Sequence, residues 1–143
     1  MLSKNIFAHS SIMYKTEHAA KVGWYSNKLE YAQDYDLSLK LIKSYESKIL
    51  SDFLTFITIR KKSMTQSNNL KVIRVKEVIS ILEKCKTEFK MNKRLSLSNS
   101  REISLQRLKL DLMSNLNIKI KLLSIFKTII KFPSLLFVYF FKL

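Results

Sequence analysis

The segment EYAQDYDLSLKL (30–41) carries two carboxylates whose spacing could do chemistry. Asp34 and Asp36 open an apolar segment. A carboxylate at such a place either accepts a proton from a reacting hydroxyl group or caps the start of a helix. The residues alone favour the cap for Asp34, whereas Asp36 suits a first helical turn, where the helix dipole favours negative charge. Both roles of Asp34 stay open at this point.

Few other side chains are candidates for a site. A lone histidine is more often structural than catalytic, and this applies to both His9 and His18. Trp24 could stack on the ring of a ligand, or it could pack in the core beneath a turn at Gly23. The single Cys85 excludes an internal disulfide, fits a reducing compartment and is expected to pack as a small apolar residue.

The elements that must position these side chains can be predicted from patterning. Residues 5–15 and 49–63 are rich in apolar and β-branched residues, which predicts two strands. Residues 16–25 predict a short helix that Thr16 caps and that ends before Gly23.

The rest of the chain predicts longer helices. Residues 34–46 have apolar residues at mainly helical spacing, and the pattern returns from residue 68 onward. The polar stretch SLSNS (96–100) predicts an interruption, after which residues 101–113 resume a helix. One Gly and one Pro in 143 residues also favour long helices with few connections.

Positive charge is concentrated in the second part of the chain. Residues 1–59 hold seven Lys/Arg and six Asp/Glu, whereas residues 60–143 hold nineteen and five. Such an excess predicts an anionic partner, either phospholipid or nucleic acid. We expect the membrane rather than nucleic acid, because no nucleic-acid motif accompanies the charge and the tail is strongly apolar.

The tail predicts a helix that lies on a membrane surface. In residues 115–132 polar side chains recur in steps of three and four, with apolar residues opposite. Pro133 ends the pattern, and the uncharged run 132–141 is ten residues long, against the roughly 20 that a bilayer requires. The side chains expected at the membrane surface are Lys121, Lys127, Lys131, Phe126 and Phe132.

Four segments resemble family 2 glycosyltransferases, which are inverting enzymes of the GT-A fold. FAHSSIMY (7–14), VGWY (22–25) and YAQDYDLSLKL (31–41) occur in the order and spacing of the acceptor-side half of that family, and DFLTFITIRKKSMT (52–65) resembles the strand and loop that follow. The resemblance implies an α+β fold that is mostly helical, with short strands. It covers residues 5–65 and implies a partial acceptor-side subdomain at 1–66. The patterning of the remaining residues, 67–143, predicts a basic helical C-terminal region with an amphipathic tail at the membrane surface.

The resemblance also implies roles for single residues. Asp34 matches the carboxylate that removes the proton from the acceptor hydroxyl group. His9, Trp24 and Asp36 would lie near the acceptor or donor. Arg60 stands where the family usually has a histidine pattern near the sugar diphosphate and its metal. An Arg can face a diphosphate but cannot bind a cation, so we expect no metal ligand there.

The family's nucleotide-binding half and its metal-binding Asp-x-Asp motif would precede this segment. We therefore expect a C-terminal fragment without cofactor, since the divalent metal belongs to the complete enzyme. A separate chain could carry the missing half, and without it we expect neither nucleotide-sugar binding nor activity. The expected location is cytoplasmic, peripheral at the inner face of the membrane. The alternative is a non-catalytic, cationic helical protein that binds a membrane or nucleic acid.

Overall fold

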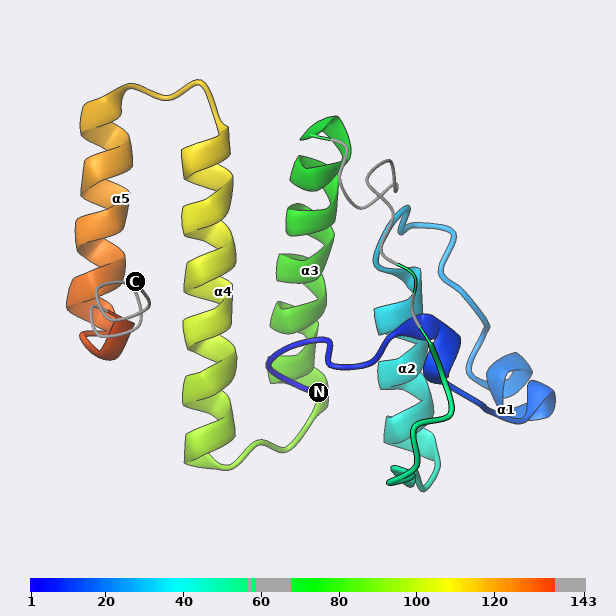
Figure 1. Cartoon of the computed structure of the whole chain (residues 1–143). Coiled ribbons are helices and arrows are strands. Elements are labelled where there is room, and N and C mark those ends of the chain that lie inside the picture. Colours follow the sequence, from blue (N-terminus) through cyan, green and yellow to red (C-terminus); the bar gives the residue numbers. More distant parts are fainter. Residues whose placement is uncertain (57, 59–67, 136–143) are drawn as a thin grey trace.

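The computed structural model describes residues 1–56, 58 and 68–135. Its elements are the 3-10 turn η1 (His9–Ser11) and the helices α1 (Thr16–Lys21), α2 (Gln33–Ser44), α3 (Asn68–Glu88), α4 (Lys93–Met113) and α5 (Ile118–Lys131). The helices α2 to α5 stand in one row, and α1 lies at the far edge beside α2 (Figure 1). Short loops join α3 to α4 and α4 to α5, so these three helices alternate in direction.

The two predicted strands are absent from the described residues. Residues 5–15 form an irregular segment around η1, and residues 49–56 are an irregular segment without a strand. Residues 57 and 59–63 of the second predicted strand lie outside the described residues. Phe53 and Phe56 in that segment are 98% and 96% exposed. A strand needs a neighbour to pair its backbone groups, and the described part of the chain provides none. The prediction of a mostly helical fold is confirmed, but its short strands are not seen.

The short helix predicted at 16–25 is confirmed as α1, although Thr16 is its first residue rather than its cap. The chain leaves α1 through two left-handed residues, Gly23 with φ of +83° and Trp24 with φ of +53°. The Gly23 N–H donates to Ala20 O at 3.1 Å and the Trp24 N–H donates to Ala19 O at 2.8 Å. This pair of bonds is a Schellman ending, and it explains why glycine follows the helix.

The helix α2 is buried on two of its faces. Tyr35 and Leu39 face one side, and Leu37 and Leu41 face the other, where they pack against Ala19 of α1. The cluster on the first side also contains Ala32, Ile81, Leu82, Cys85 and Ile103. Two buried faces explain why Leu37, Leu39 and Leu41 alternate in sequence although the segment is helical.

The predicted interruption at 96–100 is wrong, because α4 runs through it. The actual break lies at residues 89–92, between α3 and α4. Asn92 caps α4: its Oδ1 accepts a hydrogen bond from the Leu95 N–H at 2.8 Å. Serine and asparagine have low helix propensity, but tertiary contacts override it here.

Those contacts attach the N-terminal segment to the helices. Asn99 of α4 is fully buried, and its Nδ2 donates to Leu2 O at 2.6 Å and to Leu82 O at 3.1 Å. The hydroxyl group of Tyr35 donates to Met1 O at 2.8 Å. Residues 1–2 therefore lie against α2, α3 and α4, and this attachment positions Lys4 and Asn5 in the lining of the cleft described below.

Candidate functional site

A cleft of about 790 Å³ lies between the N-terminal segment, the start of α2, and the helices α3 and α4. Leu135, just beyond α5, forms part of its wall. Its polar and charged lining includes Lys4, Tyr31, Asp34, Arg74, Arg101, Glu102 and Lys109. The volume falls within the range of small-molecule sites.

Asp34 is the sequence-predicted residue that lines this cleft. Its side chain is half-buried in the first turn of α2, and its Oδ1 accepts a hydrogen bond from the Tyr35 N–H at 2.7 Å. It is not the helix cap, because Ala32 occupies that position. Asp34 therefore presents a carboxylate, which can accept a proton, at the wall of a cleft.

Glu77 of α3 supplies the cap of α2 from across the interface. Its carboxylate accepts three backbone hydrogen bonds, from the N–H groups of Glu30 at 2.7 Å, Tyr31 at 2.9 Å and Ala32 at 2.8 Å. Ala32 is the N-cap residue of α2 and the other two residues precede it, so this carboxylate binds the turn that leads into the helix, where its charge interacts favourably with the helix dipole. Glu77 thus caps α2 from a neighbouring helix, while Asp34 accepts a hydrogen bond from the first-turn amide of Tyr35.

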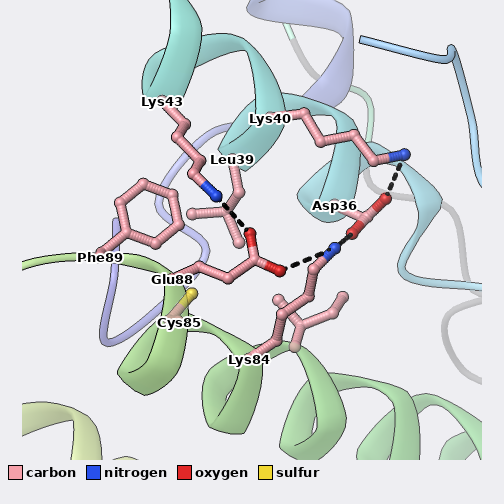
Figure 2. A pocket seen from close by; sticks show the side chains of 9 residues that line it. Asp36, Leu39, Lys40, Lys43, Lys84, Cys85, Glu88 and Phe89 are labelled. Atoms are coloured by element: carbon pink, nitrogen blue, oxygen red, sulfur yellow. Dashed lines mark hydrogen bonds and ion pairs between the residues drawn. The ribbon is translucent and has the colours of Figure 1, made fainter.

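Asp36 lies two residues from Asp34 but belongs to a different environment. It is 4% exposed in the α2–α3 interface, where Lys84 Nζ donates to its Oδ1 at 3.1 Å. Lys40 Nζ forms an ion pair with its Oδ2 at 2.8 Å (Figure 2). The structure thus places Asp36 away from the cleft lining and gives it a structural contact with α3.

The ion pairs around Asp36 continue along the α2–α3 interface. Glu88 accepts a hydrogen bond from Lys43 Nζ at 2.7 Å, and Lys84 Nζ lies 3.8 Å from its other oxygen (Figure 2). The hydrogen bond from Lys43 and the positive charge of Lys84 lower the pKa of Glu88. Burial raises the pKa of the Cys85 thiol beside them to about 11, which keeps it protonated near neutral pH.

His9 and Trp24 do not line the cleft. His9 Nε2 lies 3.1 Å from the hydroxyl group of Tyr25, which in turn lies 3.0 Å from the hydroxyl group of Tyr14. The hydrogen bond with Tyr14 raises the pKa of Tyr25 to about 12. Trp24 is 41% exposed, so it is not a core residue as one reading of the sequence required. His18, the other histidine, stacks on Tyr45 with 3.7 Å between ring centroids.

The helix predicted in the tail is confirmed as α5, and it turns its polar stripe toward α4. Ser124 Oγ donates to Asp111 Oδ2 at 2.6 Å, and Lys121 Nζ donates to Leu112 O at 3.1 Å. Six large apolar side chains of α5 are exposed: Ile118, Ile120, Leu122, Leu123, Phe126 and Ile130. The apolar face of α5 therefore points to solvent.

The five residues predicted at a membrane surface differ in exposure. Phe126, Lys127 and Lys131 are exposed, and Lys121 is half-buried against α4. Phe132 is buried, with Lys131 Nζ 5.7 Å from its ring centroid. Phe132 is thus covered by protein in this structure. Arg60 lies outside the described residues.

The cleft's basic residues were missed at the sequence level, where they counted only as general surface charge. Helical spacing could have revealed them, because Arg101, Leu105 and Lys109 are four residues apart on α4 and all line the cleft. Arg74 and Val78 are also four residues apart on α3, and both line the cleft. What the sequence does not show is that these two stripes meet the start of α2.

The described residues contain no group of three or more His, Cys, Asp or Glu side chains that could hold a metal ion. Within the same residues, no helix has both the length and the apolarity to cross a membrane. No protein-family model, curated protein or solved structure significantly matches this chain.

Proposed function

We propose that this chain is the acceptor-side portion of an inverting family 2 glycosyltransferase, with Asp34 as its general base. One observation carries the proposal: the Asp34 carboxylate lies at the wall of a cleft of about 790 Å³, and Asp34 is not the N-cap residue of its helix. The order of the segments 7–14, 22–25 and 31–41 supports it.

The chemistry assigned to Asp34 is proton transfer. As the acceptor hydroxyl oxygen attacks the anomeric carbon of a nucleotide sugar, the hydroxyl proton moves to the carboxylate and the nucleoside diphosphate leaves. Attack from the opposite face inverts the anomeric centre. A separate chain would supply the nucleotide-binding half and its divalent metal. The acceptor would be a saccharide or a lipid-linked sugar of a cell-surface polysaccharide, and the chain alone would not transfer sugar.

Saccharide binding tests this proposal directly. We expect titration of the isotope-labelled chain with a panel of oligosaccharides to shift the backbone NMR signals of residues 31–36 for at least one compound. Asp34→Asn should weaken that binding about tenfold, since a hydrogen bond to a charged group contributes roughly 1.5–3 kcal/mol. The control is Asp52→Asn, which makes the same change at an exposed residue outside the cleft. An equal loss in both variants, or no shift with any saccharide, would contradict the proposal.

The exposed face of α5 supports a second role, attachment to an anionic membrane surface. The helix contains four lysines and no acidic residue, and its apolar side chains face outward. Lysine stems can lie along the apolar surface while their charges contact phospholipid headgroups. This combination also suits an enzyme whose acceptor is linked to a lipid, at the inner face of the membrane.

Vesicle flotation tests the attachment. The whole chain should float with vesicles that contain anionic phospholipid and should remain largely unbound with neutral vesicles, because each basic residue near an anionic surface contributes about 1 kcal/mol. Phe126→Ser should reduce flotation, whereas Phe53→Ser, at an exposed phenylalanine outside α5, serves as the matched control. Equal flotation with neutral vesicles, or no effect of Phe126→Ser, would argue against the role of α5.

A further inference from the structure

The cleft has an excess of positive charge that the fold itself does not neutralise. Lys4, Arg74, Arg101 and Lys109 line it against two carboxylates, Asp34 and Glu102. Among the described residues, no ion pair joins any of the four cations to a carboxylate. Other cations of the same helices are paired: Lys84 with Asp36 and Glu88, and Arg107 with Glu83.

Arg101 has a buried hydrogen-bond donor that lacks an acceptor among the described residues. Its Nε is buried and has no hydrogen-bond partner in the described part of the chain, although the residue as a whole is half-buried. A buried donor without an acceptor costs free energy, more so when the group is charged. Its neighbour Glu102 forms no ion pair with it among the described residues, and Glu102 Oε1 instead accepts a hydrogen bond from Gln106 Nε2 at 2.6 Å.

We propose that this cleft binds a ligand through a phosphate or diphosphate group, which Arg74 and Arg101 hold as principal partners. Arginine presents a planar set of donors that matches phosphate oxygens. Four cations against two carboxylates leave the cleft with an excess of two positive charges, which suits an anion of at least two negative charges. A cleft of about 790 Å³ also has room for an organic group beside the phosphate.

Two classes of ligand carry such a phosphate or diphosphate group, and they differ in the organic part attached to it. One is a free phosphate ester or diphosphate, and the other is the phosphorylated headgroup of a lipid. The inference does not rest on sugar transfer, because Asp34 has no part in holding the anion. Asp34 would repel it, so Asp34→Asn should raise the affinity for phosphate, about two- to fivefold, while it removes the proposed base.

The test measures binding of two probes by calorimetry: inorganic pyrophosphate and a short-chain phosphatidic acid kept below its micelle concentration. We expect binding of at least one probe, and Arg101→Gln should weaken it about tenfold or more. Arg107→Gln is the matched control, since it removes the same charge from the same helix outside the cleft. Circular dichroism checks that each variant folds, and Arg74→Gln, at an exposed residue, replaces Arg101→Gln if the latter unfolds.

Each outcome decides the question. Stronger binding of pyrophosphate identifies a soluble phosphate ligand, and stronger binding of phosphatidic acid identifies a lipid headgroup. No binding of either probe overturns the inference. An equal loss in Arg107→Gln also overturns it, because the effect would then come from the overall charge of the chain. Loss of saccharide binding in Asp34→Asn without loss of pyrophosphate binding would separate this site from the proposed base.

Discussion

The helices α2 and α5 are of similar length but have opposite relations to the core. Six of the 12 residues of α2 are buried, including the charged Asp36, whereas none of the 14 residues of α5 is buried. Yet α5 is the more apolar of the two. The comparison shows that position decides burial: α2 has packed neighbours on two sides, whereas α5 stands at the end of the row and contacts α4 through polar groups (Figure 1).

This difference also separates two roles. The apolar residues of α2 pack against α1 on one side and against α3 and α4 on the other, and this packing positions Asp34 at the cleft. The apolar residues of α5 contribute little to the described core and remain available to a partner. An exposed apolar surface of this kind usually marks an interaction site.

The largest expected effect comes from the same substitution in the two helices. Leu39→Ala in α2 removes a side chain that is 5% exposed and should lower the free energy of unfolding by about 3 kcal/mol. Leu123→Ala in α5 changes a side chain that is 51% exposed and should cost less than about 0.5 kcal/mol. Urea denaturation measures both values. Similar losses in the two variants would show that α5 is part of the core.

The ion pairs of Asp36 give the next effect. Asp36→Asn removes the charge between Lys40 and Lys84 and should lower the free energy of unfolding by about 2 kcal/mol, less than for fully buried pairs because both lysines are partly exposed. Glu83→Gln breaks the exposed pair with Arg107 and should cost less than about 1 kcal/mol. If Asp36→Asn costs no more than this control, the interface does not depend on Asp36.

The cap of α2 predicts a smaller effect. Glu77→Gln keeps one oxygen acceptor but loses the negative charge and the second acceptor, so we expect a loss of about 1 kcal/mol. Amide hydrogen exchange measured by NMR should show the change at Glu30, Tyr31 and Ala32 first. Unchanged exchange at these amides would contradict the assignment of Glu77 as the cap.

The smallest effect is a dependence on pH. The pKa of Glu88 is lowered in the folded chain, chiefly by the hydrogen bond from Lys43. A lowered pKa stabilises the fold above the unfolded value of 4.5, and this contribution is lost as the pH falls through the folded value. Because both side chains are partly exposed, we expect about 0.5 kcal/mol or less. Lys43→Gln should reduce this acid-dependent loss between pH 6 and pH 3, and an unchanged pH profile would show that Lys43 is not the cause.

The sequence predicted the elements that depend on local patterns. The helices at 16–25, 34–46 and in the tail follow from spacing, from Gly23 and from Pro133, all of which act within a few residues. The predicted strands are not seen in the described residues, because an apolar run does not reveal whether a pairing neighbour exists. The interruption at 96–100 was wrong because the partners of Asn99 lie 97 and 17 residues away in sequence.

The candidate site was predicted only in part, for the same reason. Asp34 was singled out because it stands at the start of an apolar segment. The different surroundings of the two aspartates depend on α3, whose Lys84 contacts Asp36, whereas Asp34 lines the cleft. The capping role of Glu77 joins residues 45 to 47 positions apart. No local pattern contains such a contact.

The most direct test of the contrast between α2 and α5 places a fluorescent reporter on the exposed face of α5. We would measure the emission of Phe126→Trp in a Trp24→Phe background as vesicles with anionic phospholipid are added. We expect the emission to shift to shorter wavelength and to be protected from aqueous quenchers, because the side chain at position 126 enters the apolar part of the membrane. Trp24 in the unaltered chain, which lies outside α5, should not respond. Unchanged emission from position 126 would contradict the claim that this face of α5 binds the membrane.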